Sequence, residues 1–449
     1  MSTMILTKEE SIKVSGKDAQ RLKSARMACA AVWNDCVALA KAYRLANDGQ
    51  WISKSELEKA TKGGKYQLHS QSIQAVVTDY TESRDSTKTK RKQGDKKANY
   101  PWKQKKYRTI EFKQMAIKRS PQNTIQVSLS ARNTFDTGLP WMNGIGVVRL
   151  TWNRNHYAVQ YTVTVAVPEP VAPELEKLGG GDIGEIHPLA LSNAAGKTVI
   201  ISSRALRSAK QFRNKALADL YRKRSKCKKR SRQWKKLGKQ ISRVCQKAEN
   251  TCKDALHKAT RKAVNAAAGA LDITTMVIGD PKGVADKTKV KERLNRKARQ
   301  KIGQMETGTI KKLMEYKNTM AGIKTVFTEE RGTTSDCPKC ATKNLCKGRV
   351  YKCKGCGFVA HRDGKASFMM MRKVRPGMPL PAKFAVSFQR ALPKYRTGER
   401  KTGRHQCVEG PDGTRVSSAA ASLVATEHHA EGVTPGVPLA AFRPRILAL

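Results

Sequence analysis

Acidic residues are scarce in this sequence. Its 449 residues hold 36 aspartates and glutamates against 88 lysines and arginines, which leaves a formal net charge of +52. A compact chain with that charge repels itself unless a polyanion neutralises it, and the basic residues run along the whole length. The composition therefore favours a large nucleic acid, bound across several domains, over one small basic patch.

Long apolar runs are also missing, which argues against a membrane partner. Asn265 and Asp272 interrupt the best candidate before it reaches spanning length. The N-terminal residues are charged too early for a signal peptide. The 11 cysteines are an odd number, and four of them stand in a metal-binding pattern. We therefore expect a reducing, cytoplasmic compartment.

Two pairs of cysteines have the spacing of a metal site. Cys337 and Cys340 form one CxxC knuckle, and Cys353 and Cys356 form a second one twelve residues later. Each knuckle turns two thiolates toward one point, so that two knuckles make a tetrahedral sulfur cage for Zn²⁺. Because cysteine fills all four positions, we expect a structural zinc, and any catalytic chemistry must lie elsewhere.

The first 170 residues predict a β-rich lobe with a helical insertion. Helical spacing predicts helices over 17–47 and 69–86, followed by a basic loop over 86–106. Alternating apolar residues predict a strand over 3–15 and several strands between 125 and 167, with a hairpin turn at 153–155. The predicted parts are a small antiparallel barrel (1–16 and 100–170), a helical lobe (17–99) and a linker (171–177).

Residues 178–375 follow a different plan. Three short strands lie between 179 and 201, and a long helical stretch covers 205–268. Strands over 273–279 and 322–328 then alternate with helices over 304–321 and from Asp363. This is the order of an RNase H-like fold, and the whole chain is predicted to be α+β and multidomain. Residues 376–449 open with prolines and lose periodicity, which predicts a mostly disordered basic tail.

The long helical stretch begins with the most basic segment of the chain. Sixteen of the residues from Arg207 to Arg243 are lysine or arginine, and Asp219 is the one acid among them. A charge run is often a solvated face, but this density favours a surface that tracks phosphates. The candidate nucleic-acid contacts are Arg207, Lys210, Arg213, Arg222, Lys223, Arg224, Lys228, Lys229 and Arg230.

Three stretches together resemble the RuvC motifs of one family. The first is Gly181 to Gly184 around Asp182; the second is the helix with Asp254 to Arg261 and the strand after it; the third joins Leu313 to Lys317, the knuckles, and His361 to Asp363. The family is TnpB, the transposon OrfB proteins, with the related compact type V CRISPR effectors. The likeness covers about residues 178–372. The N-terminal half is similar only in plan, as a wedge-like barrel with an inserted recognition lobe.

The resemblance implies an RNA-guided DNA endonuclease. Such a protein carries a guide RNA, recognises a short motif beside its double-stranded DNA target, and cuts with one RuvC site and two Mg²⁺ ions. Here the RuvC domain would comprise 178–336 and 357–375, and the zinc ribbon 337–356. The basic residues after Arg207 would line the channel for the guide–target duplex. The sequence predicts no oligomeric state.

The predicted chemistry depends on acidic residues in this order. Two-metal hydrolysis of a phosphodiester needs hard oxygen ligands that hold two ions about 3.5–4 Å apart. Asp182 would bridge both ions from the first strand, and Asp363 would approach from the start of the last helix. Taken alone, Asp182 also fits a turn and Asp363 a helix cap. Their order, with the knuckles between them, favours a catalytic role for both.

The second motif departs from the family, because Gly279 stands where a glutamate is expected. Either the site is inactive, which leaves a guided DNA-binding protein, or another acid supplies the ligand. Glu330 follows the next strand, and neighbouring strands lie only about 4.8 Å apart. The segment after it also resembles a subset of the family in which the glutamate has moved to this place. We therefore predict Asp182, Glu330 and Asp363 as magnesium ligands, with Asp280 as the alternative and Glu329 as a weaker one.

Other positions carry weaker predictions. Lys365 stands where the family usually has an asparagine. Gln71, Ser72 and Gln74 fit contacts to adenine in the flanking motif, but a solvated helix face is the favoured interpretation. Base stacking is predicted for Trp102, Tyr107 and Trp141, whereas Trp152 fits the barrel core better. Two rival functions are a transposase with a similar acidic triad and a general zinc-ribbon nucleic-acid-binding protein.

Overall fold

The computed structural model describes residues 2–62, 64–169, 177–281, 295–344, 346, 348–392, 408–409, 415–416 and 445–447. They belong to two compact units, residues 1–392 with 444–449, and residues 393–443. In the second unit the described part is a short hairpin of β16 (Val408–Glu409) and β17 (Arg415–Val416). Within the described ranges, no helix has the length and apolar character to cross a membrane.

The N-terminal strands form two sheets. One has the order β18–β1–β7–β6–β2, and the other the order β3–β4–β5. The strands are β1 (Ser2–Ile12), β2 (Ile110–Phe112), β3 (Ile117–Arg119), β4 (Thr124–Ser130), β5 (Asn133–Pro140), β6 (Ile145–Asn153), β7 (His156–Val167) and β18 (Arg445–Leu447). Arg154 lies in the predicted hairpin turn with a φ of 58°. The described strands do not close into the predicted barrel, because the 3₁₀ turn η2 (Gln114–Ala116) separates β2 from β3.

Three helices complete the N-terminal lobe: α1 (Gly16–Ala46), α2 (Lys54–Ala60) and α3 (Ser70–Lys92), with the 3₁₀ turn η1 (Gly64–Tyr66) between the last two. The Ser15 hydroxyl accepts a hydrogen bond from the Asp18 backbone and so begins α1. The buried stripe of α1 packs in one core with α3 and the strands. Helix α3 runs on to Lys92, into the segment predicted as loop, because the basic residues of its last turn stabilise a helix C-terminus.

A six-stranded sheet forms the centre of the other half, with the order β12–β11–β8–β9–β10–β15. Its strands are β8 (Leu178–Asp182), β9 (Leu189–Asn193), β10 (Lys197–Ser202), β11 (Thr275–Asp280), β12 (Lys324–Glu329) and β15 (Ala385–Arg390). Strands β8, β11 and β12 are parallel, and β9 is antiparallel between β8 and β10. The first five strands therefore have the predicted RNase H-like arrangement.

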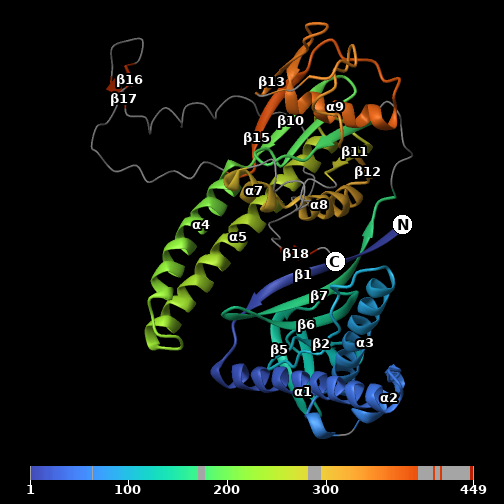
Figure 1. The fold of residues 1–449 in the computed structure, drawn as a ribbon, viewed down its shortest axis with the longest axis vertical. Coiled ribbons are helices and arrows are strands. Elements are labelled where there is room, and N and C mark those ends of the chain that lie inside the picture. The colour runs from blue at the N-terminus through green and yellow to red at the C-terminus, as the bar shows by residue number, and fades with distance from the viewer. Residues whose placement is uncertain are drawn as a thin grey trace. The chain divides into compact units, whose positions relative to one another are not determined.

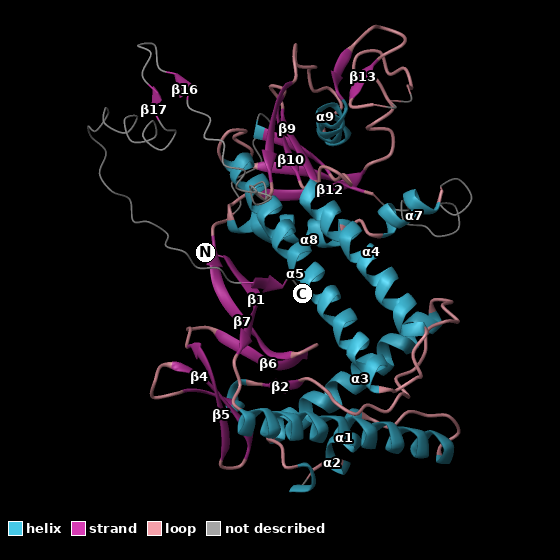
Figure 2. Cartoon of the chain, turned by 90° about the vertical axis from the view of Figure 1, so that its left-hand side faces the viewer, coloured by secondary structure: helices cyan, strands magenta, loops and turns pink. Residues whose placement is uncertain are grey.

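Helices cover both faces of this sheet (Figure 2). They are α4 (Arg204–Ser225), α5 (Arg232–Ala268), α7 (Arg296–Gly303), α8 (Thr307–Met320) and α9 (Arg362–Val374). Met276 and Ile278 of β11 belong to the apolar cluster with α5 and α8, whereas Val277 belongs to the cluster with α9. The alternation of a strand thus separates the two cores. Gly180 of β8 must lack a side chain, because a Cβ there would collide with the Ser367 carbonyl oxygen of α9.

Two predictions about this half need correction. The stretch 205–268 is two helices, α4 and α5, which lie side by side (Figure 1), since Arg230 adopts a φ of 69° in the turn between them. Residues 385–390, predicted to be disordered, form β15, which pairs in parallel with β10. Strand β15 lies at the edge of the sheet, where backbone hydrogen bonds hold it and its side chains are little buried. Its sequence therefore has a weak apolar pattern. Most of the predicted tail beyond residue 392 lies outside the described residues.

The cysteine knuckles flank a small hairpin between β12 and α9. Its strands are β13 (Val350–Lys352) and β14 (Val359–His361), which pair antiparallel. Tyr351 of β13 is fully buried and clusters with Cys337 and Cys353. This hairpin and its knuckles, residues 337–361, are called the cysteine ribbon below.

Candidate functional site

The predicted acidic residues meet at one edge of the six-stranded sheet. Asp182 ends β8, Glu330 follows β12, and Asp363 lies in the first turn of α9. Because β8 and β12 both run parallel to β11, their carboxyl ends reach the same edge, where open α/β sheets usually place their sites. All three acids line one cavity of about 350 Å³.

The carboxyl groups of Asp182 and Glu330 are hydrogen-bonded to each other. Burial raises the pKa of Asp182 well above its usual value, and the hydrogen bond and charge of Glu330 and then the charge of Asp363 add to the effect. Burial also raises the pKa of Glu330, although its hydrogen bonds to Asp182 and to the Ile183 backbone oppose this. Without a cation, the pair therefore favours sharing a proton over carrying two negative charges.

Glu330 occupies the space above Gly279. A Cβ built on Gly279 would lie 3.0 Å from Cγ and 3.1 Å from Oε1 of Glu330. The glutamate that follows β12 thus places its side chain over the residue of β11 where the resemblance would put a glutamate. Gly279 of β11 is paired with Thr328 of the neighbouring strand β12, and Glu330 directly follows that strand.

The two alternative acids point elsewhere. The Asp280 carboxylate forms an ion pair with Lys311 Nζ of α8 at 2.8 Å, and the residue is not among those that line the cavity. It remains near enough for its charge to raise the pKa of Glu330. Glu329 is exposed. The geometry therefore favours Glu330 as the third acid beside Asp182 and Asp363.

Two arginines hold the Asp363 carboxylate. Arg349 Nη1 donates to one oxygen at 2.7 Å, and Arg362 Nε donates to the other at 3.2 Å. The Asp363 side chain is only 8% exposed, so these two charges offset its burial. Arg349 belongs to the cysteine ribbon and also lines the cavity. The sequence analysis missed it, because nothing in its local pattern separates it from the many other basic residues.

The four predicted cysteines form one cluster. The four sulfur atoms lie within 4.8 Å of one another. The sulfurs of Cys337 and Cys356 are 3.6 Å apart, and those of Cys340 and Cys353 are 3.5 Å apart. Backbone N–H groups, first that of Cys356 and also that of Gly355, lower the pKa of Cys353 to about 6. Four sulfurs at this spacing, one of them a ready thiolate, fit a tetrahedral metal ion.

Lys365 links the cysteine ribbon to the acidic cavity. It is fully buried on α9, and its Nζ donates to the carbonyl oxygens of Thr334 at 2.8 Å and Asp336 at 2.9 Å. The same ammonium lies 3.9 Å from the centre of the Tyr351 ring. It therefore fixes the loop that runs from Glu330 to Cys337 against the helix that carries Asp363.

The predicted nucleic-acid contacts divide into engaged and exposed groups. Lys210 is largely buried and pairs with Glu306 at 2.7 Å, and Arg207 pairs with Glu185 at 3.5 Å. Arg224 stacks on Trp234, and Arg213 hydrogen-bonds its neighbour Asn214. Five of the nine are exposed on α4 or in the turn after it: Arg222, Lys223, Lys228, Lys229 and Arg230. Arg222 and Lys223 both pair with Asp219.

The N-terminal residues that were predicted to contact bases differ in their exposure and contacts. Ser72 is buried and donates to the Glu111 carbonyl, so it is unavailable to a base, whereas Gln74 is exposed. Trp102 stacks on Trp51 with ring centres 5.1 Å apart. Trp152, predicted to be core, is 44% exposed, because it lies near the end of β6.

Taken together, the sheet order, the acids at its carboxyl edge and the cysteine ribbon before the last helix define an RNase H-like protein of the RuvC type. Residues 160–285 match the family model described as "Probable transposase" (OrfB_IS605). Residues 308–370 match the model described as "Cas12f1-like, TNB domain". These two matches confirm the resemblance of this half of the chain to TnpB, the transposon OrfB proteins, and the compact type V effectors.

Solved structures are similar in fold. A Cas12f1 protein in complex with sgRNA and target DNA matches with a TM-score of 0.54 and 13% identity, over 80% of this chain and 83% of that one. The mini RNA-guided endonuclease Cas_phi3 matches with a TM-score of 0.46 and 10% identity, over 85% of this chain and 93% of that one. No curated protein matches the chain.

Proposed function

We propose that this protein is an RNA-guided DNA endonuclease with one nuclease site, formed by Asp182, Glu330 and Asp363. The observation that carries the proposal is the position of Glu330, which fills the space above Gly279, bonds to Asp182 and shares a cavity with Asp363. The triad of carboxylates is thus complete in spite of the missing second-motif glutamate.

The three carboxylates fit two Mg²⁺ ions. Hard oxygen donors are the ligands that Mg²⁺ prefers, and a cation would replace the proton that the hydrogen-bonded pair now shares. When bound, such ions activate water and stabilise the leaving oxygen in phosphodiester hydrolysis. Asp182, Glu330 and Asp363, which line one cavity, would hold the ions.

Arg349 and the cysteine ribbon complete the site. The Arg349 guanidinium lines the cavity, and its planar fork suits a phosphate oxygen of the strand to be cut. A structural Zn²⁺ in the cluster of Cys337, Cys340, Cys353 and Cys356 would fix the hairpin that carries it. Through Lys365 the same ion would steady the loop after Glu330.

The proposed partners are a guide RNA and double-stranded target DNA. The net charge of +52 and the dense cations of α4 and the following turn support a large polyanion. The similar Cas12f1 structure holds a guide RNA and a target DNA. We propose that the exposed cations contact the backbone of the guide–target duplex and leave its sequence to base pairing.

Cleavage of a plasmid library with a randomised flank tests this function. The protein is purified with its copurifying RNA and assayed in Mg²⁺ as wild type, Asp182→Ala, Glu330→Ala and Glu329→Ala. We expect the wild type and the exposed-site control Glu329→Ala to cut next to a short defined motif, and the other two to be inactive. Cutting that survives Glu330→Ala would reject the relocated ligand.

Two other functions have an observation in their favour. Gly279 favours an inactive guided DNA-binding protein, and the match to the "Probable transposase" model favours a transposase. A guided DNA-binding protein without nuclease activity would bind the target in a gel-shift assay but leave the plasmid intact. A transposase would join DNA strands and copurify without a defined RNA. Sequencing of the copurified nucleic acid separates the last case from the other two.

A further inference from the structure

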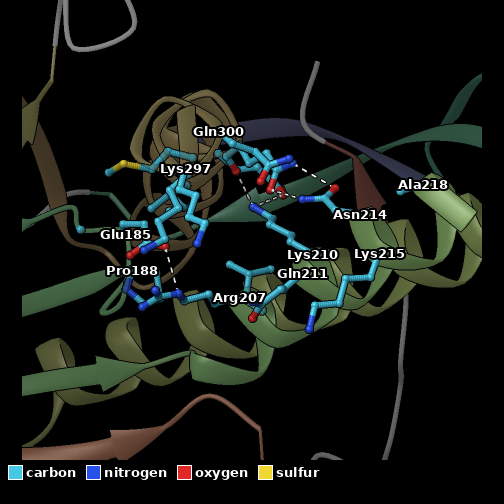
Figure 3. Close-up of a pocket in the computed structure, with 17 residues that line it drawn as sticks. Glu185, Pro188, Arg207, Lys210, Gln211, Asn214, Lys215, Ala218, Lys297 and Gln300 are labelled. Atoms are coloured by element: carbon cyan, nitrogen blue, oxygen red, sulfur yellow. Dashed lines mark hydrogen bonds and ion pairs between the residues drawn. The ribbon is translucent and has the colours of Figure 1, made fainter. Parts of the chain in front are cut away.

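A second cavity adjoins the acidic one. It has a volume of about 440 Å³ and lies between α4, α7 and the start of α8 (Figure 3). Gly184, Glu185 and Met305 line both cavities, so the two cavities are neighbours that share one wall. Whatever lies in the second cavity is therefore next to the carboxylates.

The walls of this cavity are held by ion pairs. Lys210 is only 12% exposed, and its Nζ donates to the Gln304 carbonyl oxygen and pairs with Glu306. Arg207 pairs with Glu185 on the side of the acidic cavity, as Figure 3 also shows. These two cations connect α4 to the opposite wall, so they shape the cavity and are largely withdrawn from binding.

Two amides face each other across it. Asn214 Nδ2 donates to Gln304 Oε1 at 3.4 Å, and Gln304 Nε2 donates to Asn214 Oδ1 at 3.2 Å. Both bonds are long, so opening the pair costs little. Asn214 Oδ1 also accepts from the neighbouring Arg213, through Nη2 at 3.2 Å and Nε at 3.4 Å, and these bonds are long as well. With both sets open, each amide offers a donor and an acceptor side by side. Asparagine and glutamine use this arrangement to bind the edge of adenine.

Apolar and cationic groups complete the lining. Pro188, Leu206 and Ile310 supply an apolar surface of the kind on which a base lies. Lys215, Lys297 and Lys301 are exposed at the rim, and no hydrogen bond or ion pair of theirs is found within the described part of the chain. An apolar floor, an amide pair and free ammonium groups together match a base with its phosphates.

We propose that this cavity binds one unpaired nucleotide of the strand being cut, next to the bond that is broken, and that Asn214 and Gln304 select adenine there. The inference rests on the proposed nuclease function and adds a base preference to it. The lysines of the rim hold the flanking phosphates. Because the two cavities share a wall, the phosphate next to this nucleotide would lie near Asp182.

Sequencing of cut ends tests the base preference. Target DNA randomised around the cut is digested by wild type, by the double variant Asn214→Ala/Gln304→Ala, and by Gln233→Ala, which removes an exposed amide of α5 outside the cavity. We expect about tenfold enrichment of adenine at one position for wild type and Gln233→Ala. The double variant should lose that enrichment. Equal base use by wild type, or unchanged enrichment in the double variant, would overturn the proposal.

Photocrosslinking tests the cavity without any cleavage. The Asp182→Asn chain is irradiated with a single-stranded pentanucleotide that carries one 8-azidoadenine, and the crosslinked peptides are identified by mass spectrometry. We expect crosslinks within 204–218 or 300–306 that excess adenine-containing oligonucleotide removes and the double variant lacks. Crosslinks confined to the turn at 226–231 would reject the cavity even for an active nuclease. Crosslinks in the cavity, combined with a wild-type chain that cuts no target, would reject the nuclease function instead.

Discussion

The side chain of Glu330 lies where a side chain of Gly279 would project: Cγ of Glu330 is 3.0 Å from the Cβ position of that glycine. The glycine leaves this space to Glu330 and to Met370, whose Cε is the nearest atom at 2.6 Å. A side chain at this point of β11 would crowd both residues. Gly279 and Glu330 thus belong to one arrangement. The carboxylate comes from the residue after β12 instead of from β11.

Gly279→Ala is expected to reduce DNA cleavage about threefold to tenfold, because the added Cβ crowds Met370 and Glu330 and catalytic groups are sensitive to small displacements. Plasmid cleavage rates at saturating Mg²⁺ measure it. Gly308→Ala is the control, since no atom lies within 4 Å of a Cβ at that glycine. The double variant Gly279→Glu/Glu330→Ala should recover part of the activity. Full activity of Gly279→Ala would show that Glu330 does not need its present position.

Removal of one acid should stabilise the metal-free chain. The folded pKa values of Asp182 and Glu330 are raised, so the folded state binds more protons than the unfolded state above the usual carboxyl pKa. Stability is then lost as the pH rises from about 4 through the raised values. We expect Asp182→Asn to melt roughly 2–5 °C higher than wild type at pH 8 without Mg²⁺.

Calorimetry at pH 5 and pH 8 checks this expectation. The difference between Asp182→Asn and wild type should shrink at pH 5, where the shared proton is retained. Added Mg²⁺ should raise the melting temperature of wild type more than that of the variant, because ligand binding stabilises the folded state. A variant that is less stable than wild type at pH 8 would contradict the raised pKa values.

Arg349 competes with cations for Asp363. Its guanidinium donates to the carboxylate at 2.7 Å, so a metal ion must displace or accommodate it. We expect Arg349→Ala to bind Mn²⁺ several-fold more tightly, and to cut DNA more slowly because a phosphate contact is lost. Titration followed by electron paramagnetic resonance measures the affinity. Lys352→Ala, an exposed change on the same hairpin, should alter neither property, and weaker Mn²⁺ binding by Arg349→Ala would count against competition.

Lys365→Met should disturb the ribbon and the acidic cavity together. The change leaves the carbonyl oxygens of Thr334 and Asp336 without their donor in a buried place, which costs about 1–3 kcal/mol. We expect a lower melting temperature and weaker Mn²⁺ binding with the zinc content preserved. Lys373→Met is the matched control, since its Nζ also donates to this loop, at the Arg331 carbonyl oxygen, but from an exposed position. Equal effects of the two changes would rule out a special role for Lys365.

The sequence predicted the parts of the molecule that depend on repeating patterns. The short apolar run of β11 and the three-to-four spacing in α5 placed these elements, and the order of the elements predicted the RNase H-like sheet. The CxxC spacing predicted the cysteine cluster for the same reason, because a short loop fixes the geometry of its two thiols. Asp182, Glu330 and Asp363 were predicted by the resemblance together with the parallel strand order.

What sequence reasoning missed depends on contacts between distant side chains. Arg349 and Lys365 differ from other basic residues only through the groups they meet after folding, Asp363 and the loop before Cys337. Lys210 looked like a nucleic-acid contact, but it is held by Glu306. The edge strand β15 was missed because it buries little. A basic chain offers many equivalent cations, and their roles are set by which acids fold next to them.

The cysteine cluster should bind one zinc ion per chain. Cys353→Ser removes the thiol with the lowered pKa, and we expect it to reduce the zinc content well below one equivalent and to lower the melting temperature, because structural zinc contributes folding free energy. Elemental analysis and calorimetry measure the two effects.

Cys346→Ser is the control, because that thiol lies in the same ribbon but is not one of the four clustered sulfurs, and contacts the Val350 carbonyl instead. Zinc retained by Cys353→Ser, or lost equally from Cys346→Ser, would mean that these four sulfurs are not the ligands. Loss of zinc should also weaken Mn²⁺ binding at the carboxylates, since Lys365 ties the ribbon to the loop after Glu330.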